Sequence, residues 1–147
     1  MGHTYTTAHF HIVFSTKSRQ KLIAKAIQPR LWAYMAGICS NVGIVALAIG
    51  GIEDHVHSLV ELPPTMSLSK ALNLLKSNSS SWMSKQQGGF HWQEGYGAFA
   101  VSVSNLATVK RYVLNQQAHH RKMTFEDEFI TLLEKHGVQY DPRHVFD

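Results

Sequence analysis

The pair His55 and His57 is the first feature of this sequence that could do chemistry. The two histidines are separated by one apolar residue, Val56, inside a run of strand-forming residues at 51–60. Side chains alternate between the two faces of a strand, so both imidazoles would point to one side while Val56 points into a core. Two neutral imidazoles on one face make half of a metal site, and further ligands must come from elsewhere.

A second pair of this type, His9 and His11, lies in an alternating aromatic and β-branched run at 8–15. This run predicts a first strand. Both histidines would suit the open face of a half-buried strand as well as a metal ion. The pattern therefore leaves their role open.

Tyr112 and Gln116 are the other chemically capable pair, four residues apart in a segment with helical periodicity. Residues at this spacing occupy one face of a helix. A phenol and an amide on a partly exposed helix are also compatible with a purely structural role. The spacing alone does not decide between the two.

The elements that must position these residues follow from periodicity and turn signals. Pro29 starts a helix that ends before Gly43, the turn Glu53-Asp54 joins two strands as a hairpin, and Thr124 caps the last helix. The expected strands are 8–15, 44–51, 55–62 and 98–103, and the expected helices are 28–42, 67–86, 106–118 and 125–136.

The predicted order is thus β-α-β-β-α-β followed by two helices. This order matches an α+β fold of the ferredoxin-like or RRM-like kind, a four-stranded antiparallel sheet with helices on one face and the other face available. A C-terminal helix carrying Tyr112 would lie over the histidine pair. At 147 residues with 44% hydrophobic content, residues 1–147 are expected to form one domain.

Composition favours a cytoplasmic protein with no membrane partner. The single cysteine, Cys39, lies among apolar residues, and the longest apolar run, 44–52, is too short to cross a bilayer. Residues 1–122 hold twelve Lys and Arg against four Asp and Glu, whereas residues 123–147 hold two against six. A basic body with an acidic tail favours a polyanionic partner, although an uneven solvated surface would look the same.

Together these residues resemble the HUH-class single-tyrosine transposases of bacterial insertion sequences, usually called TnpA, and the related REP-associated tyrosine transposases. The resemblance covers nearly the whole chain. It rests on His55-Val-His57 in a strand followed by Tyr112-Val-Leu-Asn-Gln116 on a late helix. Supporting stretches are His11-Ile-Val-Phe14, Trp92-Gln-Glu-Gly-Tyr-Gly-Ala-Phe99 and His119-His-Arg-Lys-Met-Thr-Phe125.

The resemblance implies a site and a reaction. His55, His57 and Gln116 would bind one divalent metal, Mg²⁺ or Mn²⁺, and Tyr112 would attack single-stranded DNA to form a 5′-phosphotyrosine. Three neutral ligands would leave the ion its full charge for a phosphate oxygen. An unperturbed tyrosine has a pKa of about 10, so the attack needs deprotonation, help from the metal or a base that the sequence does not identify.

The resemblance also implies partners. The DNA would carry hairpins at the element ends, with phosphate contacts expected from Lys17, Arg19, Lys76, Lys110 and Arg121. In insertion-sequence members the tyrosine helix of one protomer completes the histidine pair of the other, which predicts a homodimer with composite active sites. The REP-associated relatives can act as monomers.

Two other classes fit the same sequence features. One is another HUH endonuclease, such as a replication initiator or relaxase that nicks DNA, although these are usually parts of larger chains. The other is a non-catalytic nucleic-acid-binding domain of the same fold, which stacking aromatics on the open sheet face would favour. A metal-dependent hydrolase that uses water is more distant, because it would not keep its product covalently bound.

Overall fold

Four strands form one antiparallel sheet in the computed structural model, which describes residues 2–147. The strands are β1 (His9–Ser15), β2 (Val45–Ile52), β3 (His55–Glu61) and β4 (Gly97–Ala100), in the spatial order β2-β3-β1-β4. This is the ferredoxin-like arrangement that the element order predicted. β1 and β3 are central, so the histidines of both strands lie in the middle of the sheet.

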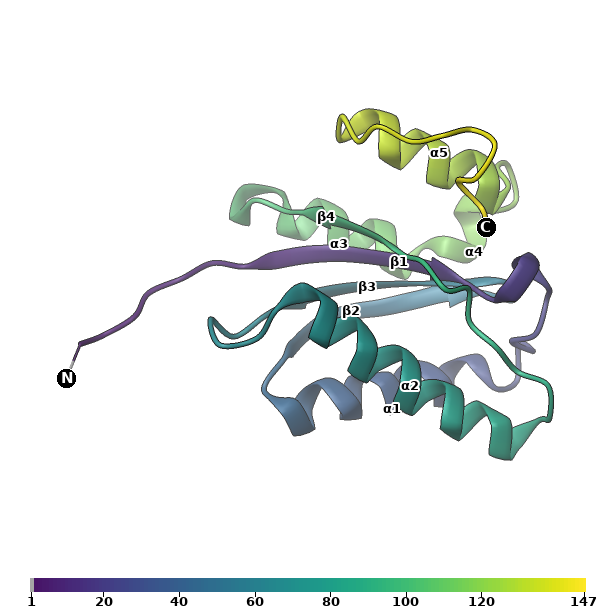
Figure 1. The fold of residues 1–147 in the computed structure, drawn as a ribbon, viewed down its shortest axis with the longest axis horizontal. Helices are drawn as coiled ribbons and strands as arrows, with labels where there is room; N and C mark the ends of the chain where they lie inside the picture. Colours follow the sequence, from purple (N-terminus) through teal and green to yellow (C-terminus); the bar gives the residue numbers. More distant parts are fainter. Residues whose placement is uncertain (1) are drawn as a thin grey trace.

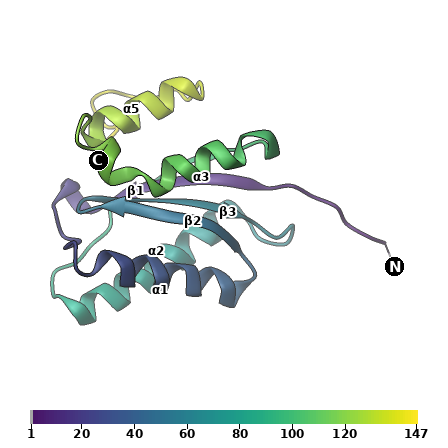
Figure 2. The same cartoon turned by 180° about the vertical axis from the view of Figure 1, so that it is seen from behind.

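Helices cover both faces of this sheet (Figures 1 and 2). One face carries α1 (Gln28–Val42) and α2 (Leu68–Gln86), and the other carries α3 (Leu106–Leu114), α4 (Gln116–His119) and α5 (Phe125–Lys135). The structure also contains short 3-10 turns at Lys17–Arg19 and Val103–Asn105. The second face is therefore not open but roofed by the C-terminal third of the chain. Within residues 2–147, no helix is both long and apolar enough to span a membrane.

Alternation along β1 and β3 divides the interior into two cores. Phe14 and Val56 point toward α1 and α2 and belong to the larger apolar cluster. Val13 points the other way and packs with Phe125 and Phe129 of α5. The same alternation places the imidazoles of β3 under the C-terminal helices.

The hairpin between β2 and β3 fixes the position of the histidine pair. Ile52 pairs with His55 and Gly50 pairs with His57, so only Glu53 and Asp54 form the turn, as predicted. On the other side of β3, Val13 of β1 pairs with His57. Two neighbouring strands thus hold the backbone of both histidines.

Two predicted elements differ from the structure by more than one residue at an end. β4 ends at Ala100 rather than at residue 103, because β1 begins at His9 and offers no further partner beyond the bond from Val101 N–H to the His9 carbonyl. The predicted helix 106–118 is broken at Asn115, which has φ −107° and ψ 28°. The Tyr112 carbonyl accepts from Asn115 N–H and from the side-chain amide of Gln116, which competes with regular helical bonding.

Close packing of α3 on the sheet depends on Gly50. A methyl group at this position would overlap the backbone carbonyl of Val113, so Gly50→Ala must push α3 away from β2. We expect Gly50→Ala to lower the free energy of unfolding by about 1–3 kcal/mol. Urea denaturation measures this change.

The matched control is Gly37→Ala in α1, where an added methyl group meets nothing within 4 Å. Since alanine is the better helix former, this variant should be unchanged or more stable by up to about 1 kcal/mol. Equal stability of the two variants would contradict the close approach of α3 to β2.

Candidate active site

His55 and His57 project from β3 into a fully buried cluster beneath the C-terminal helices. Gln116, at the start of α4, reaches the same place: its Oε1 atom lies 3.1 Å from His55 Nε2. The structure therefore brings together the two histidines and the amide that the sequence singled out. Gln116 is itself buried, so these contacts are shielded from water.

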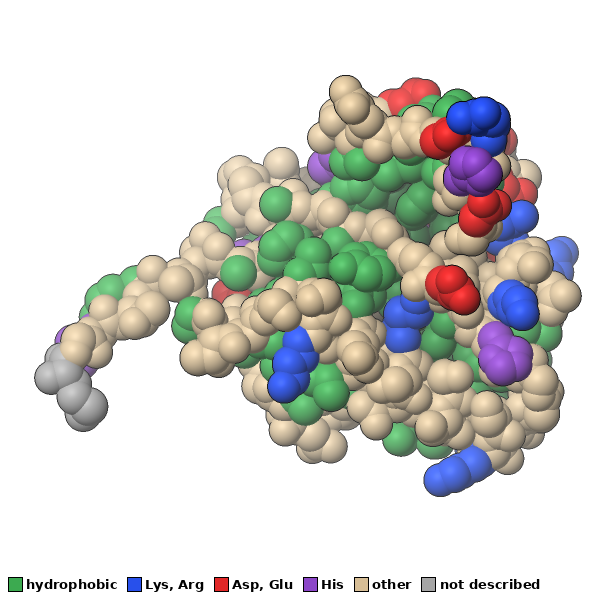
Figure 3. Space-filling model, in the orientation of Figure 1, with side chains coloured by type: hydrophobic (Ala, Val, Ile, Leu, Met, Phe, Trp, Pro, Cys, Tyr) green, Lys and Arg blue, Asp and Glu red, His purple; other side chains and the backbone are tan. Residues whose placement is uncertain are grey.

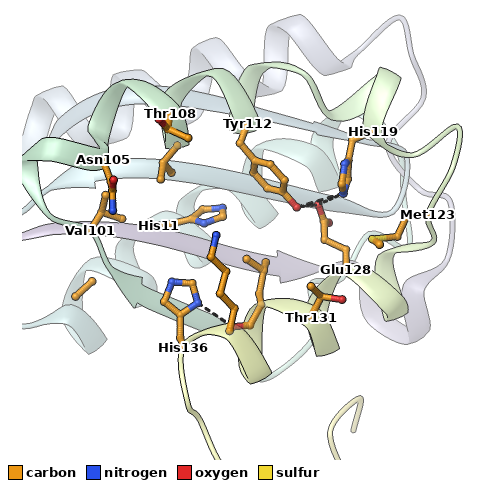
Figure 4. A pocket seen from close by; sticks show the side chains of 14 residues that line it. His11, Val101, Asn105, Thr108, Tyr112, His119, Met123, Glu128, Thr131 and His136 are labelled. Carbon is orange, nitrogen blue, oxygen red and sulfur yellow. Dashed lines mark hydrogen bonds and ion pairs between the residues drawn. The ribbon is translucent and has the colours of Figure 1, made fainter.

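Glu128 of α5 lies at the centre of this cluster. Its Oε1 atom is 3.0 Å from His57 Nε2, 3.3 Å from His55 Nε2 and 3.0 Å from His120 Nε2. Its other oxygen, Oε2, accepts a hydrogen bond from the Tyr112 hydroxyl and lies 3.3 Å from His119 Nε2 (Figure 4). One carboxylate thus joins the histidine cluster to the phenol.

Tyr112 points from α3 toward Glu128 and His119 (Figure 4). Its ring meets the imidazoles of His11 and His57 edge-on, with centroids 5.8 Å and 5.7 Å away. Burial, followed by the charge of Glu128, raises the pKa of Tyr112 well above its usual value. The environment of the phenol therefore favours its protonated form.

The histidines of the cluster have divergent proton affinities. Burial lowers the pKa of His57 to about 4 and that of His11 to about 3. Burial also opposes the charged form of His55, but contacts with the carboxylates of Asp54 and Glu128 raise its pKa to about 9. Burial likewise acts against the charge of Glu128, yet its contacts with His120, His55 and His57 hold its pKa well below the usual range.

The second histidine pair is divided between two roles. His11 Nε2 lies 2.7 Å from His57 Nδ1, so His11 supports the ring of His57. His9 is not part of the cluster and instead pairs with Glu61, with His9 Nε2 2.9 Å from the Glu61 carboxylate.

Two members of the cluster, His120 and Glu128, were missed by sequence reasoning. His120 was named only within the stretch 119–125 that supports the resemblance, although it continues the four-residue spacing of Tyr112 and Gln116. Glu128 falls on the apolar stripe of α5 between Phe125 and Phe129, and it is only 1% exposed. An acidic residue on the buried stripe of a helix was the signal that could have revealed it.

The donor set suits a divalent metal ion. His55, His57, His120 and Glu128 each offer one ligand atom, and these atoms all lie within 4.8 Å of one another. Imidazole and carboxylate donors together suit Mn²⁺ and other first-row divalent ions. His55 Nδ1 lies 2.7 Å from the Asp54 carboxylate, the kind of outer contact that orients a ligating histidine.

A comparison with protein families matches residues 4–116 to the family described as "Transposase IS200 like". The chain belongs to this family. The transposase for insertion sequence element IS200 of Salmonella typhimurium is 27% identical over 124 residues, 79% of this chain and 81% of that protein. The ISDra2 transposase TnpA of Deinococcus radiodurans is 23% identical over 123 residues, 78% of this chain and 87% of that protein.

Solved structures share the fold of this IS200-like transposase. A crystal structure of a candidate transposase from Deinococcus radiodurans R1 matches with a TM-score of 0.64 and 23% identity, over 79% of this chain and 96% of that chain. A REP-associated tyrosine transposase bound to a REP hairpin matches with a TM-score of 0.62 and 12% identity, over 82% of this chain and 73% of that chain.

The five basic residues expected to contact DNA lie in different settings on the transposase. Lys17, Lys110 and Arg121 are exposed. Arg19 donates to the Phe146 carbonyl at 3.1 Å and its guanidinium covers the Phe146 ring. Lys76 donates to three backbone carbonyls, at Gln93, Glu94 and Gly95, over 2.6–3.1 Å, so its ammonium holds this loop.

The acidic tail of the transposase covers the site. In Figure 3 most acidic side chains on this face lie over α5 and the segment after it, with some lysine or arginine among them, and other lysines and arginines are scattered over the rest of the face. The charge imbalance found in the sequence therefore corresponds to two parts of the structure. The acidic segment 123–147 packs over the basic part formed by residues 1–122.

A cavity of about 330 Å³ opens beside Tyr112, between α3 and α5 (Figure 4). Val101, Val109 and Leu132 give it apolar walls, and Tyr112 and Glu128 are among its polar lining. The volume falls at the lower end of the range of small-molecule sites in proteins. The phenol is thus reachable from this side of the molecule.

Proposed function

We propose that this transposase cleaves and rejoins single-stranded DNA at insertion-sequence ends with Tyr112 as the nucleophile. The observation that carries the proposal is the junction at Glu128, where the Tyr112 hydroxyl and the buried His55 and His57 share one carboxylate. A phenol beside a potential metal site, reachable through a cavity, is the arrangement that phosphoryl transfer to a tyrosine requires.

His55, His57 and Gln116 would hold Mg²⁺ or Mn²⁺ in this proposal. When bound, such an ion polarises a phosphate oxygen and neutralises charge that develops in the transition state. The contact between Gln116 Oε1 and His55 Nε2 supports a common site for the three residues.

In the cleavage step, the Tyr112 oxygen forms a bond to phosphorus and the bond from phosphorus to the 3′ oxygen breaks. The leaving 3′ oxygen takes up one proton, which balances the proton that the phenol gives up, so the products are a 5′-phosphotyrosine and a free 3′-OH. Glu128 Oε2 accepts the hydrogen bond of the phenol and is therefore the nearest acceptor for its proton. One phosphodiester replaces another, so the 3′-OH of a second end can reverse the step without an external energy source.

The substrate class follows from the same proposal. Single-stranded DNA with hairpin ends would contact the exposed cations Lys17, Lys110 and Arg121 through its phosphates. Arg19 and Lys76 are not included, because their charged groups already bond within the protein. A cytoplasmic site of action stays a prediction.

The proposal is tested by incubating the protein with labelled single-stranded DNA from its own genomic flanks and Mg²⁺ or Mn²⁺. A protein–DNA adduct that survives denaturation is expected, together with a released fragment that ends in a 3′-OH. A released product without any adduct would favour hydrolysis by water. Binding without cleavage would favour a non-catalytic nucleic-acid-binding domain.

A homodimer with composite sites is an alternative arrangement of the same residues, because the junction at Glu128 joins Tyr112 to the histidines of its own chain. Mixing inactive His57→Ala protein with inactive Tyr112→Phe protein tests it. If protomers exchange tyrosines, one site of each heterodimer has both intact residues, and equal mixing should restore up to about a quarter of wild-type adduct. If each chain uses its own Tyr112, mixing should restore none, and the composite arrangement would be wrong.

A further inference from the structure

Four side-chain atoms converge beneath α4 and α5, and two of them belong to residues outside the proposed ligand set. Glu128 Oε1 lies 3.0–3.3 Å from the Nε2 atoms of His55, His57 and His120. Around an octahedral ion with ligand distances of 2.0–2.1 Å, adjacent ligand atoms are about 3 Å apart. The distances from Glu128 Oε1 to the three nitrogens therefore match those between adjacent ligands of one small cation.

Each of the three imidazoles also has a polar partner at its other ring nitrogen, Nδ1. His55 Nδ1 lies 2.7 Å from the Asp54 carboxylate, and His120 Nδ1 lies 2.7 Å from the Met123 carbonyl. His57 Nδ1 faces His11 Nε2 at 2.7 Å. Since carboxylate and carbonyl oxygens only accept hydrogen bonds, Nδ1 carries the proton in His55 and His120. Their neutral forms therefore present an Nε2 lone pair to the cluster.

These lone pairs face oxygens that are also acceptors. His120 Nε2 lies 3.0 Å from Glu128 Oε1 and 3.0 Å from Gln116 Oε1. His55 Nε2 likewise lies 3.3 Å from Glu128 Oε1 and 3.1 Å from Gln116 Oε1. Acceptors at such distances repel unless positive charge lies among them. Either extra protons or a metal ion must therefore supply that charge.

We propose that His120 and Glu128 are metal ligands in this protein, together with His55 and His57. The inference rests on the proposed metal site and extends it to the C-terminal segment. Glu128 would give Oε1 to the ion and keep Oε2 on the Tyr112 hydroxyl, which places the nucleophile one carboxylate away from the metal. The site then carries a negative ligand, in contrast to the all-neutral set expected from the sequence.

A structural consequence is that the ion would link the C-terminal segment, from α4 to α5, to the sheet. His55 and His57 belong to β3, whereas His120 follows α4 and Glu128 belongs to α5. Metal bound by both groups joins parts of the chain that are separated by more than sixty residues. Mn²⁺ should therefore slow amide hydrogen exchange in α5, and this effect should be lost in a variant without Glu128.

The direct test is Mn²⁺ affinity, measured by calorimetry and by loss of the free-ion EPR signal. Glu128→Gln and His120→Asn should each weaken Mn²⁺ binding about 100-fold or more, on the scale of losing a metal-site component. Matched controls are Glu134→Gln on the same helix and His91→Asn, both exposed, which should change the affinity less than twofold. Wild-type affinity in both Glu128→Gln and His120→Asn would overturn the inference.

His57→Ala separates this inference from the proposed function. If His57→Ala abolishes Mn²⁺ binding while the Glu128 and His120 variants bind normally, only the added ligands are wrong. If His57→Ala also binds normally, the metal site of the proposed function fails as well. Should a variant not fold, pulsed EPR of Mn²⁺ in the wild-type protein still decides: coupling to three imidazole nitrogens supports His120 as a ligand, and coupling to two contradicts it.

Discussion

Tyr112→Phe is expected to abolish the covalent protein–DNA adduct, with a loss of at least about a thousandfold in rate, as for other nucleophiles acting in concerted sites. Phenylalanine keeps the ring that packs edge-on against His11 and His57, and removes only the hydroxyl. The fold and Mn²⁺ affinity should therefore persist. Denaturing gels with labelled DNA measure the adduct, and calorimetry measures the metal.

The matched control is Tyr34→Phe on α1, where a partly exposed tyrosine stacks on Trp82 on the face of the sheet opposite to the site. It should form the adduct at the wild-type rate. A persistent adduct in Tyr112→Phe, mapped to another residue by peptide sequencing, would show that Tyr112 is not the nucleophile.

His57→Ala should have the second largest effect, because it removes an imidazole that contacts both His11 and Glu128. The variant should lose Mn²⁺ affinity and adduct formation by about 100-fold or more. It should also lower the free energy of unfolding by about 3–5 kcal/mol, since Glu128 loses one of its buried partners and a cavity is left. Metal titration and urea denaturation measure the two effects separately.

His9→Ala is the control for this variant, because His9 lies on the adjacent central strand but pairs with Glu61 outside the cluster. Its Mn²⁺ affinity and adduct yield should remain within about twofold of wild type. His57→Gln, which fills more of the space, should recover part of the stability without the metal affinity. Full metal affinity in His57→Gln and His57→Ala would remove this histidine from the site.

The sheet and the position of the histidine pair were predictable because the sequence patterns that specify them lie within short stretches of the chain. Alternation around Val56 put both imidazoles on one face, and the two-residue turn before His55 fixed the hairpin register. The capped α5 was equally readable, since Thr124 accepts from Asp127 N–H at 3.2 Å and Gly137 has a φ of 67°. Each of these features depends on residues within one or two turns of each other.

The break at Asn115 and the role of Glu128 were not predictable in the same way. The break depends on Gln116 turning its amide back to the Tyr112 carbonyl while its oxygen faces His55, a contact across the fold. The role of Glu128 was not predicted, because the apolar residues around it in the sequence indicated an ordinary core helix. Its partners lie on β3, α3 and the segment after α4, so only the tertiary fold brings them together.

The roofed sheet has a consequence for how this transposase must read DNA. Within residues 2–147, helices cover both faces of the sheet and leave no flat platform on which a row of bases could stack, and the cavity that Tyr112 lines opens between α3 and α5. A DNA strand that reaches Tyr112 can therefore place only the few nucleotides around the reacting phosphate in contact with the cavity. Surfaces outside the cavity must then select the DNA sequence that is cut. Substitutions on those surfaces should change target preference without changing the rate of the chemical step.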